Sequence, residues 1–488
     1  MAIYADNRLR KQIRKVLLIN PHGKIKITKE GSRERKLAVP SLGLGYLAAG
    51  LLKNGFDVEV LDVLIEGFYN EQLVDDTITY GLDDEAIGKQ ILNSNPDIIG
   101  VSCIMSNRSR DVARICNIAK QVIPDVHVTI GGQHPSGIPE MVLNNDIDYV
   151  LRGEADNSFI HLIESINTKG NLLEVGGIVL KDGGNLFSSN SQDYPDVKRL
   201  PYPAWKLFNL EKYWEVGISD YEINENIGKR FMVMMTSRGC PHRCYFCTSA
   251  MMSGRKFRQR EINDVLSEIR NYKEKYNVDE IHFWDDNFFI NNKRTKELLK
   301  RLINNFSGIQ FQVPSGSEAN KLDEEIVDLA AKAGFKKLFV AVESTNENIQ
   351  NKLIDKKVNV GRIPYIVKKI QEAGMIAEGS FMVGFPGETK KHIDETFESV
   401  KSFGFDRISI SIVNPLPGTP LYEQCKRENL LYEDFDVQNI RWSIENIKLE
   451  GIERGYIAQK RRDVWVEYMK DRIDIKKYEN EGVRIGGG

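Results

Sequence analysis

The sequence predicts an α/β fold with an N-terminal doubly wound parallel sheet, a partial (β/α)6 barrel and a small helical C-terminal region. Short apolar runs alternate with helical segments over about residues 15–167 and again over 230–429, the pattern of parallel strands joined by helices. The 488 residues also exceed one ordinary domain. We predict a first domain over 1–167, a connector over 168–229, a second domain over 230–429 and a helical region over 430–488.

The first domain begins with an apolar strand at 15–21, which a turn at Asn20-Pro21 ends. A helix at 42–52 follows, and its small residues allow it to lie close to a sheet or a flat ligand. Further strands are expected at 56–62, 97–102, 127–132 and 148–154. In open parallel sheets ligands bind at the carboxyl ends of strands. The residues expected there are Asn20, Pro21, Ser102, Gly131, Gly132, Gln133, Gly153 and Glu154.

These strand ends resemble those of the cobalamin-binding domain, a Rossmann-like fold. Ser102-Cys103-Ile104 matches its S-x-L motif, and Gly131-Gly132 matches its glycine pair, which lets backbone approach a ligand closely. His22 stands at the histidine offset of its D-x-H-x-x-G motif, but Asn20 and Ile25 replace the other two residues. The resemblance implies bound cobalamin and leaves a histidine ligand to cobalt unsupported. A flavodoxin-like module without ligand is the alternative.

The connector contains a hairpin turn signal at 181–185 and a stiff, proline-rich run at 200–205. Six barrel strands are expected after it, at 231–235, 280–284, 309–313, 337–342, 379–383 and 407–412, with helices such as 323–333 between them. In barrels of this type the chemistry lies at the carboxyl ends of the strands. The final region is expected to be helical over 456–478.

Cys240, Cys244 and Cys247 follow the first barrel strand with the spacing C-x3-C-x2-C. Complete ligation of a cubane iron–sulfur cluster takes four cysteines, so three would leave one iron open to a small molecule. Structural zinc needs four ligands, and no second ligand pair follows the triplet. The other cysteines are scattered singly and no secretory signal is seen, which argues against a disulfide.

The triplet and its lead-in, Thr236-Ser237-Arg238-Gly239-Cys240-Pro241, resemble the radical S-adenosylmethionine (radical SAM) superfamily, and the resemblance to this family and the cobalamin domain covers most of the chain. It implies a 4Fe–4S cluster on the three cysteines, S-adenosylmethionine chelated by the open iron, and a 5′-deoxyadenosyl radical formed by one-electron cleavage. The difficult chemistry then belongs to the cofactors.

The resemblance also assigns residues at the other strand ends. Asp285 and Asp286 stand where the family receives the methionyl amino group through backbone carbonyls; their carboxylates are candidate catalytic groups facing the substrate, or caps of the next helix. Ser317 follows the third strand, and Glu343 with Ser344 takes the ribose-contacting position. Gly384 lies in the loop against the adenine, for which a plain turn is the alternative. Phe246 adjoins the last cysteine and completes the expected cofactor-binding set.

Composition excludes some classes of partner. The net charge is −2, without the basic surplus that nucleic acid requires, and no apolar stretch approaches the ~20 residues of a membrane span. We therefore expect a cytoplasmic enzyme with a small-molecule substrate and a reductant such as flavodoxin or ferredoxin. Residues Arg255, Lys256, Arg258 and Arg260 form a basic run after the cysteines, either a solvated face or a contact for an anionic substrate or the electron donor.

The resulting prediction is a cobalamin-dependent radical SAM methyltransferase that methylates an unactivated carbon or a phosphorus centre. The alternative keeps both cofactors but performs oxidative cyclisation or ring rearrangement without net methyl transfer. A methylthiotransferase is disfavoured because no second cysteine triplet precedes Cys240. A redox carrier without catalysis is disfavoured because it has no use for an open iron.

Overall fold

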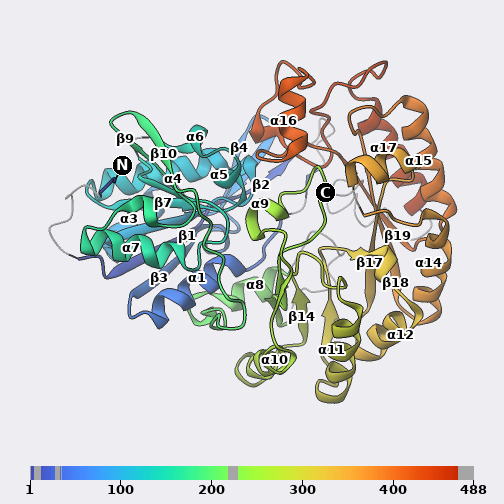
Figure 1. Cartoon of the computed structure of the whole chain (residues 1–488), viewed down its shortest axis with the longest axis horizontal. Coiled ribbons are helices and arrows are strands. Elements are labelled where there is room, and N and C mark those ends of the chain that lie inside the picture. The colour runs from blue at the N-terminus through green and yellow to red at the C-terminus, as the bar shows by residue number, and fades with distance from the viewer. Residues whose placement is uncertain are drawn as a thin grey trace. The chain divides into compact units, whose positions relative to one another are not determined.

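A computed structural model describes residues 2–4, 12–27, 33–34, 36–144, 146–217, 229–354 and 356–470. These residues form two compact units. Unit 1 takes its described residues from 1–27, 36–219 and 251–253, and unit 2 takes the others. Both are α/β, as predicted (Figure 1). The domain boundaries proposed from the sequence stay a prediction.

Unit 1 is built on a seven-stranded sheet in the order β10-β9-β8-β7-β6-β1-β3. Five of its strands are parallel and lie where the sequence predicted them: β1 (Lys15–Asn20), β3 (Asp57–Asp62), β6 (Ile98–Ser102), β7 (His127–Gly131) and β8 (Tyr149–Leu151). In the sheet these five strands lie in the order β3-β1-β6-β7-β8. The chain first extends the sheet on one side of β1, with β3, and then on the other side, with β6, so the direction of the strand order reverses between β1 and β6. Such a reversal creates a crevice at the carboxyl ends of the two strands, where open sheets bind ligands.

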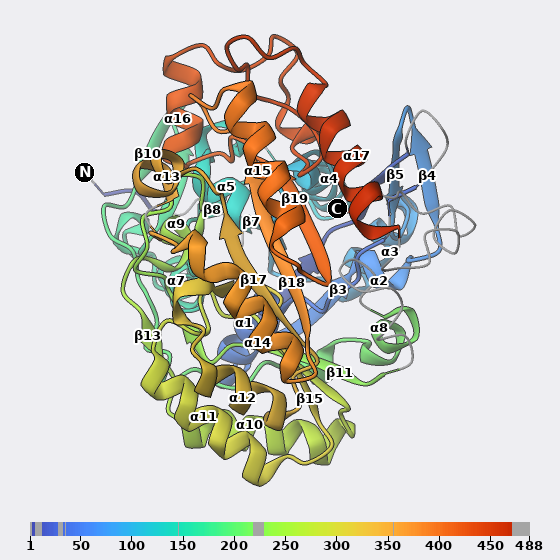
Figure 2. The ribbon, with the colours of Figure 1, turned by 90° about the vertical axis from the view of Figure 1, so that its right-hand side faces the viewer.

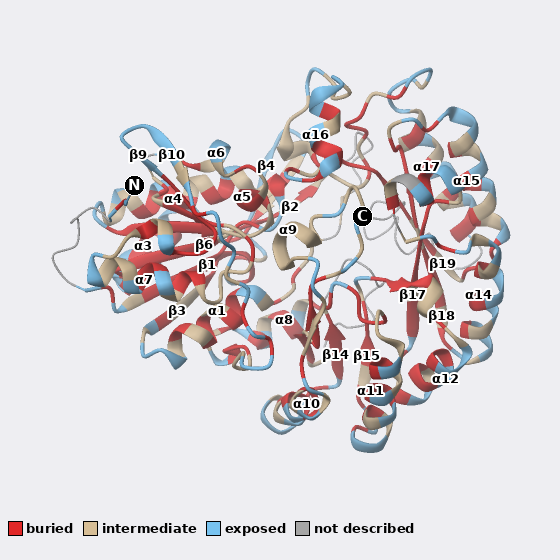
Figure 3. Cartoon of the chain, viewed as in Figure 1, coloured by how far each residue is buried: buried red, intermediate tan, exposed pale blue. Residues whose placement is uncertain are grey.

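Helices cover both faces of this sheet and bury its apolar strands. Helix α1 (Leu42–Lys53) contacts β1, β3 and α7 (Ser158–Thr168), while α3 (Asp84–Ser94) packs against α4 (Ser109–Val122). The central strands β1, β6, β7 and β8 are almost entirely buried and the outer helix surfaces are exposed (Figure 3). The remaining short helices are α2 (Val63–Glu66), α5 (Gln133–Gly137), α6 (Pro139–Val142) and α8 (Leu210–Val216).

The predicted connector contributes two strands to this sheet. The hairpin signal is confirmed: β9 (Ile178–Asp182) and β10 (Asn185–Ser188) are antiparallel, and Gly183 and Gly184 both have positive φ between them. This is the geometry that favours glycine in two-residue hairpins. A second, three-stranded antiparallel sheet of β2 (Gly23–Lys26), β5 (Thr77–Tyr80) and β4 (Glu71–Val74) was not predicted.

Unit 2 contains the six predicted barrel strands, divided between two parallel sheets. The first holds β11 (Phe231–Met234), β14 (Glu280–Phe283) and β15 (Gln310–Gln312). The second holds β17 (Lys337–Glu343), β18 (Ile376–Val383) and β19 (Arg407–Ile412), together with the short strand β16 (Ser317–Glu318), which was not predicted. A single parallel bridge, Phe311 to Phe335, connects the third strand to the segment before β17. The partial barrel therefore has a break between its third and fourth strands.

Helices follow the barrel strands and cover their outer side (Figure 2). The predicted helix at 323–333 is α12, which Asp323 caps by accepting a hydrogen bond from Ile326 N at 2.9 Å. The longer ones are α10 (Ile262–Tyr276), α11 (Asn292–Asn305), α12 (Glu324–Ala333), α14 (Ile363–Glu372) and α15 (Lys390–Ser402). The shorter ones are α9 (Ser249–Ser253), α13 (Glu347–Ile349), the π-helical turn η5 (Gln350–Ile354) and α16 (Pro420–Arg427). A separate antiparallel pair is formed by β12 (Ser237–Arg238) and β13 (Arg258–Gln259).

The C-terminal region packs on the last barrel strand. Helix α17 (Tyr456–Met469) contacts β19, and Tyr468 Oη donates to the carbonyl of Phe405 at 2.7 Å. The helix predicted over 456–478 is confirmed up to Met469, and its remainder lies outside the described residues. Across the described ranges, no helix has both the length and the apolar character needed to cross a membrane.

Candidate active site

The three cysteines lie on one loop at the carboxyl end of β11. Cys240 and Cys244 are half-buried, and Cys247 is exposed. The backbone N–H of Cys240 donates to the carbonyl of Gly254 at 3.3 Å, so the loop closes on the segment that follows α9. Burial raises the pKa of the Cys240 thiol and raises that of Cys244 to about 12. As thiols they would stay protonated at neutral pH, and metal binding would have to remove their protons.

A buried carboxylate holds the start of this loop. Asp285, at the end of β14, is fully buried and accepts hydrogen bonds from Thr236 N at 3.0 Å, from Thr236 Oγ1 at 2.8 Å and from the hydroxyl of Ser237. Burial raises its pKa, although these hydrogen bonds oppose the shift. The guanidinium of Arg294 donates to Thr236 Oγ1 at 3.2 Å, which places a positive charge beside the group.

Asp286 binds the same loop nearer to the cysteines. It is exposed, and accepts from Gly239 N at 2.8 Å and from Ser249 Oγ at 2.5 Å, which lie on either side of the triplet. Neither aspartate caps the following helix, since Asn291 caps α11. The catalytic role expected for Asp285 and Asp286 stays a prediction, whereas the contacts give both a positioning role.

Two further barrel segments contact the cysteine loop. The imidazole of His242 lies 2.8 Å from Glu318 Oε2, and Asn287 Nδ2 donates to the same oxygen at 3.1 Å. Burial alone would raise the pKa of Glu318, but the hydrogen bond with His242 holds it below its ordinary value. Tyr245 N donates to the carbonyl of Leu353 at 2.8 Å, in the π-helical turn after β17. The loop is thus held from the ends of β14, β16 and β17.

The thiols do not form a site for a single metal ion. Among the described residues, no three His, Cys, Asp or Glu side chains gather closely enough to hold one. Ligands to one zinc ion converge on a point, while cysteines that bind a cluster attach to different irons and remain further apart. Three soft thiolate donors on one anchored loop fit the cluster in donor chemistry and in number.

Glu343, the last residue of β17, has an unusual backbone conformation. Its φ is +66°, a left-handed value that costs energy in a non-glycine residue and occurs often at functional sites. Its buried carboxylate pairs with Lys356 Nζ at 2.7 Å. Burial lowers the pKa of Lys356, but its interactions with Glu343, Cys244 and Cys247 together outweigh burial and raise the pKa above the ordinary value. Sequence reasoning missed Lys356.

Gly384 begins a tight loop after β18 that a buried glutamate organises. Glu388 Oε2 accepts from Gly384 N at 2.6 Å and from Phe385 N at 2.8 Å. Burial raises the pKa of Glu388 to about 7, although these hydrogen bonds lower it. The ring of Phe385 meets that of Phe246 edge to face, with centroids 5.8 Å apart. The predicted residues Phe246 and Gly384 are therefore brought together.

Several polar atoms at these strand ends are buried without a hydrogen-bond partner in the described part of the chain. Buried polar groups are nearly always paired, so such a group needs an explanation, and an absent ligand is one. At the carboxyl ends of the barrel strands these atoms are Trp284 Nε1, Asn287 Oδ1, Ser317 Oγ, Gln350 Oε1 and Glu388 Oε1, while others, such as Glu280 Oε2 at the amino end of β14, lie elsewhere in the unit. The first five follow β14, β15, β17 and β18. This distribution fits a polar ligand such as S-adenosylmethionine at the carboxyl ends of the strands.

Asn20 belongs to a buried network at the crevice of unit 1. Its amide donates to Asp62 Oδ1 at 2.8 Å, and the hydroxyl of Tyr213, on α8, donates to Asp62 Oδ2. Burial raises the pKa of Asp62 and that of Tyr213. His22, next to Pro21, places Nε2 2.7 Å from the carbonyl of Leu82, and its buried Nδ1 has no hydrogen-bond partner among the described residues. Asp62 and Tyr213 carried no motif signal.

The ends of β6, β7 and β8 are tied together. Ser136 Oγ donates to the Gly132 carbonyl at 2.7 Å and accepts from Gly153 N at 2.9 Å. His134 N donates to the carbonyl of Cys103 at 3.1 Å. Gly132 has φ +111°, and a Cβ there would lie 2.8 Å from the Cys103 carbonyl oxygen. The predicted residues that share this sheet end are Ser102, Gly131, Gly132, Gln133, Gly153 and Glu154.

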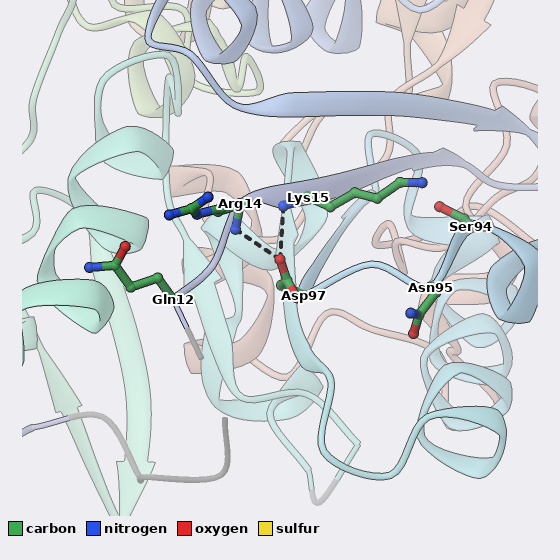
Figure 4. A pocket seen from close by; sticks show the side chains of 6 residues that line it. All are labelled: Gln12, Arg14, Lys15, Ser94, Asn95 and Asp97. Carbon is green, nitrogen blue, oxygen red and sulfur yellow. Dashed lines mark hydrogen bonds between the residues drawn. The ribbon is translucent and has the colours of Figure 1, made fainter. Parts of the chain in front are cut away.

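A polar pocket lies at the opposite end of the strands of the unit 1 sheet (Figure 4). It is lined by Gln12, Arg14, Lys15, Ser94, Asn95 and Asp97, where β1 and β6 begin. Asp97 Oδ2 accepts from the backbone N–H groups of Arg14 and Lys15 at 2.8 and 2.9 Å. None of the predicted cofactor residues lines it, and it lies at the amino ends of the strands.

The fold and the chemistry at the strand ends together fit an enzyme with one cobalamin-binding sheet and one radical SAM barrel. A model of the Radical SAM superfamily matches residues 234–400, and a model of the B12 binding domain matches residues 32–163. The cytidylyl-2-hydroxyethylphosphonate methyltransferase of Streptomyces wedmorensis is 30% identical over 477 residues, covering 91% of this chain and 88% of that protein. The chain belongs to the cobalamin-dependent radical SAM enzymes.

Two further comparisons agree with this assignment. The anaerobic magnesium-protoporphyrin IX monomethyl ester cyclase of Rubrivivax gelatinosus is 23% identical over 81% of this chain and 69% of its own length. The solved structure of the radical SAM methyltransferase TsrM from Kitasatospora setae, with cobalamin and a [4Fe-4S] cluster bound, shares the fold with a TM-score of 0.67, 19% identity, and coverage of 85% of this chain and 78% of that one. The predicted family, enzyme class and three cofactors are confirmed.

Proposed function

We propose that the chain transfers a methyl group to an unactivated carbon or a phosphorus centre of a small molecule. The similarity to a phosphonate methyltransferase over nearly the whole of both chains supports methylation over cyclisation, because the cyclase is less similar and is covered over a smaller share of its length. When bound, the three cofactors supply a methyl donor and a means of removing a hydrogen atom from the substrate.

The observation that carries the proposal is the anchored cysteine loop surrounded by unpaired polar atoms. Cys240, Cys244 and Cys247 would hold the cluster and leave its fourth iron for S-adenosylmethionine. Phe246, Ser317, Glu343, Ser344 and Gly384 would surround that molecule, as predicted. Lys356, which was not predicted, would place a positive charge near its carboxylate while remaining fixed by Glu343.

The chain's own residues position the reactants and exclude water. Asp285 and Asp286 hold the loop on both sides of the triplet, so the cluster would be oriented before the substrate arrives. Glu388 fixes the backbone of the loop that would face the adenine. In unit 1 the glycine-lined sheet end would receive cobalamin, with Gly131, Gly132 and Gly153 allowing the close approach of its tail.

The test is product analysis with anaerobically reconstituted protein, cobalamin, S-adenosylmethionine carrying a deuterated methyl group, and a chemical reductant. We expect both 5′-deoxyadenosine and S-adenosylhomocysteine, with the deuterated methyl group on cobalamin, because this enzyme class consumes S-adenosylmethionine in both ways. Formation of 5′-deoxyadenosine without S-adenosylhomocysteine would instead support the cyclase-like alternative. Absence of both products would contradict the proposed function.

A further inference from the structure

The basic run that follows the cysteines separates into buried and exposed parts in the structure, with Arg258 half-buried on β13 between them. Arg260 is buried, and its guanidinium pairs with Glu268 at 2.5 Å, so it supports the fold. Arg255 and Lys256 are exposed. Arg243, which lies within the cysteine triplet itself, is exposed as well. The cysteine loop and the segment that closes on it thus present three cations to solvent.

These three cations lack acidic partners in the part of the chain that the structure describes. Arg255 Nη1 donates to the carbonyl of His242 at 2.8 Å, which fixes the guanidinium on the backbone of the cysteine loop. Many other exposed lysines do pair with acids, such as Lys332 with Asp328 at 2.6 Å. A chain with a net charge of −2 therefore concentrates unpaired positive charge beside its redox centre.

We propose that Arg243, Arg255 and Lys256 form the docking surface for an acidic one-electron carrier protein. The inference rests on the proposed function, since only a redox cluster on this loop needs an electron. Arg243 lies between Cys240 and Cys244 and is exposed, so the loop reaches the surface where the carrier would approach. The carrier is oxidised by one electron, and the cluster is reduced by one electron. Like-signed charge on one face attracts an oppositely charged partner and increases its association rate about 10- to 1,000-fold.

The test compares the holoenzyme with the double variant Arg243→Glu/Lys256→Glu. Reduced flavodoxin, an acidic carrier, supplies electrons in one arm, and reduced methyl viologen, a small cation, supplies them in the other. The matched control is Lys275→Glu/Lys336→Glu, which reverses two exposed lysines next to the amino ends of β14 and β17. Binding of flavodoxin is measured separately by calorimetry, so that the result does not depend on turnover.

At low salt we expect the double variant to lose about tenfold or more of its flavodoxin-dependent rate of 5′-deoxyadenosine formation, together with flavodoxin binding. The control should behave like the parent protein, and the rate with methyl viologen should be unchanged in both. At 1 M salt the difference should disappear, since the Debye length is then about 3 Å.

Unchanged flavodoxin binding in the double variant would overturn the proposal. An equal loss of rate with both reductants at all salt concentrations would also overturn it, because the residues would then support the loop itself. If the parent formed no 5′-deoxyadenosine even with methyl viologen, the proposed function would fail, while flavodoxin binding would still decide the docking surface.

Discussion

The carboxylate of Asp285 shows how a single residue organises the cysteine loop. It accepts hydrogen bonds from the N–H and the hydroxyl of Thr236 and from the hydroxyl of Ser237, which all lie at the start of the loop. A buried carboxylate whose oxygens are occupied by donors on the loop is suited to fixing the position of that loop. This is a different task from the acid–base chemistry that its place after the second strand suggested.

Asp285→Asn tests this positioning role. An amide has one accepting oxygen in place of two, so at least one buried donor loses its partner at a cost of about 1–3 kcal/mol. We expect a lower thermal unfolding midpoint and less iron after reconstitution, whereas Asp286→Asn, at an exposed position, should keep nearly full iron content.

The same pair of variants separates positioning from catalysis. If Asp285→Asn retained the iron content and unfolding midpoint of the parent, the positioning role would be wrong. If Asp286→Asn loaded a full cluster but formed no methylated or radical-derived product, the original prediction of a catalytic aspartate would be supported for that residue.

Glu388 makes stability depend on pH in a defined direction. Burial raises the pKa of this carboxyl to about 7 in the folded state, against 4.5 ordinarily. Between these values the folded protein binds more protons than the unfolded chain, so stability falls as pH rises through that window. The difference corresponds to roughly 3 kcal/mol at most. Relative to Glu388→Gln, the parent apo-protein should therefore lose thermal stability from pH 5 to pH 7 and change little above pH 8.

The control for this effect is Glu347→Gln, which neutralises an exposed glutamate in the same unit. Its unfolding midpoint should follow that of the parent at every pH. A parent and a Glu388→Gln variant whose midpoints differ by a constant amount from pH 5 to pH 8 would show that the carboxyl does not titrate in this range.

Motif spacing could identify the residues that act through their own chemistry. Cys240, Cys244 and Cys247 are recognisable because cluster ligation requires that spacing, and Gly384 because a turn requires glycine. Lys356 and Tyr213 could not be found in this way. Tyr213 lies 151 residues from its partner Asp62, and Lys356 is selected by its contact with Glu343 across the turn after β17. Such partnerships exist only in the folded chain.

At the scale of elements, the glycine pair Gly131-Gly132 at the end of β7 has a left-handed backbone at Gly132 and lies close to the backbone that follows β6. Gly132 has φ +111°, and any side chain there would meet the backbone of Cys103. We expect Gly132→Ala to cost about 1–3 kcal/mol and to weaken cobalamin binding at least about tenfold, as measured by absorbance titration.

Gly50→Ala in α1 is the matched control. A Cβ there meets only ordinary contacts at 3.8 Å or more, and alanine favours the helix by about 0.5–1 kcal/mol. This variant should bind cobalamin like the parent. Equal cobalamin affinity in Gly132→Ala and the parent would contradict a role for this strand end in binding the cofactor.

The pattern of apolar residues determined which elements could be predicted. Buried parallel strands are short continuous apolar runs, and all five in unit 1 and six of the seven in the two parallel sheets of unit 2 were located within a few residues; the exception is the two-residue β16. The sheet of β2, β5 and β4 escaped prediction because its strands are short and β4, with the sequence Glu-Gln-Leu-Val, is exposed throughout. The break between the third and fourth barrel strands also left no pattern in the sequence.

At the scale of the whole molecule, two units each place their predicted cofactor residues at the carboxyl ends of parallel strands. The order of the strands in the sheet explains this in unit 1, and the succession of strand-end loops around the cysteines explains it in unit 2. The fold class and the family could be predicted because both units use repeated strand–helix alternation and the triplet is specific. The substrate could not, since the recognised motifs bind cofactors.

The most direct measurement of the central claim is the iron content and 5′-deoxyadenosine yield of Cys244→Ala after anaerobic reconstitution. Cys116→Ala, which removes a buried thiol of unit 1, is the control. The account predicts about four irons per chain and 5′-deoxyadenosine in the parent and the control, and loss of both to background in Cys244→Ala. A Cys244→Ala protein that kept its iron and its yield would contradict the account.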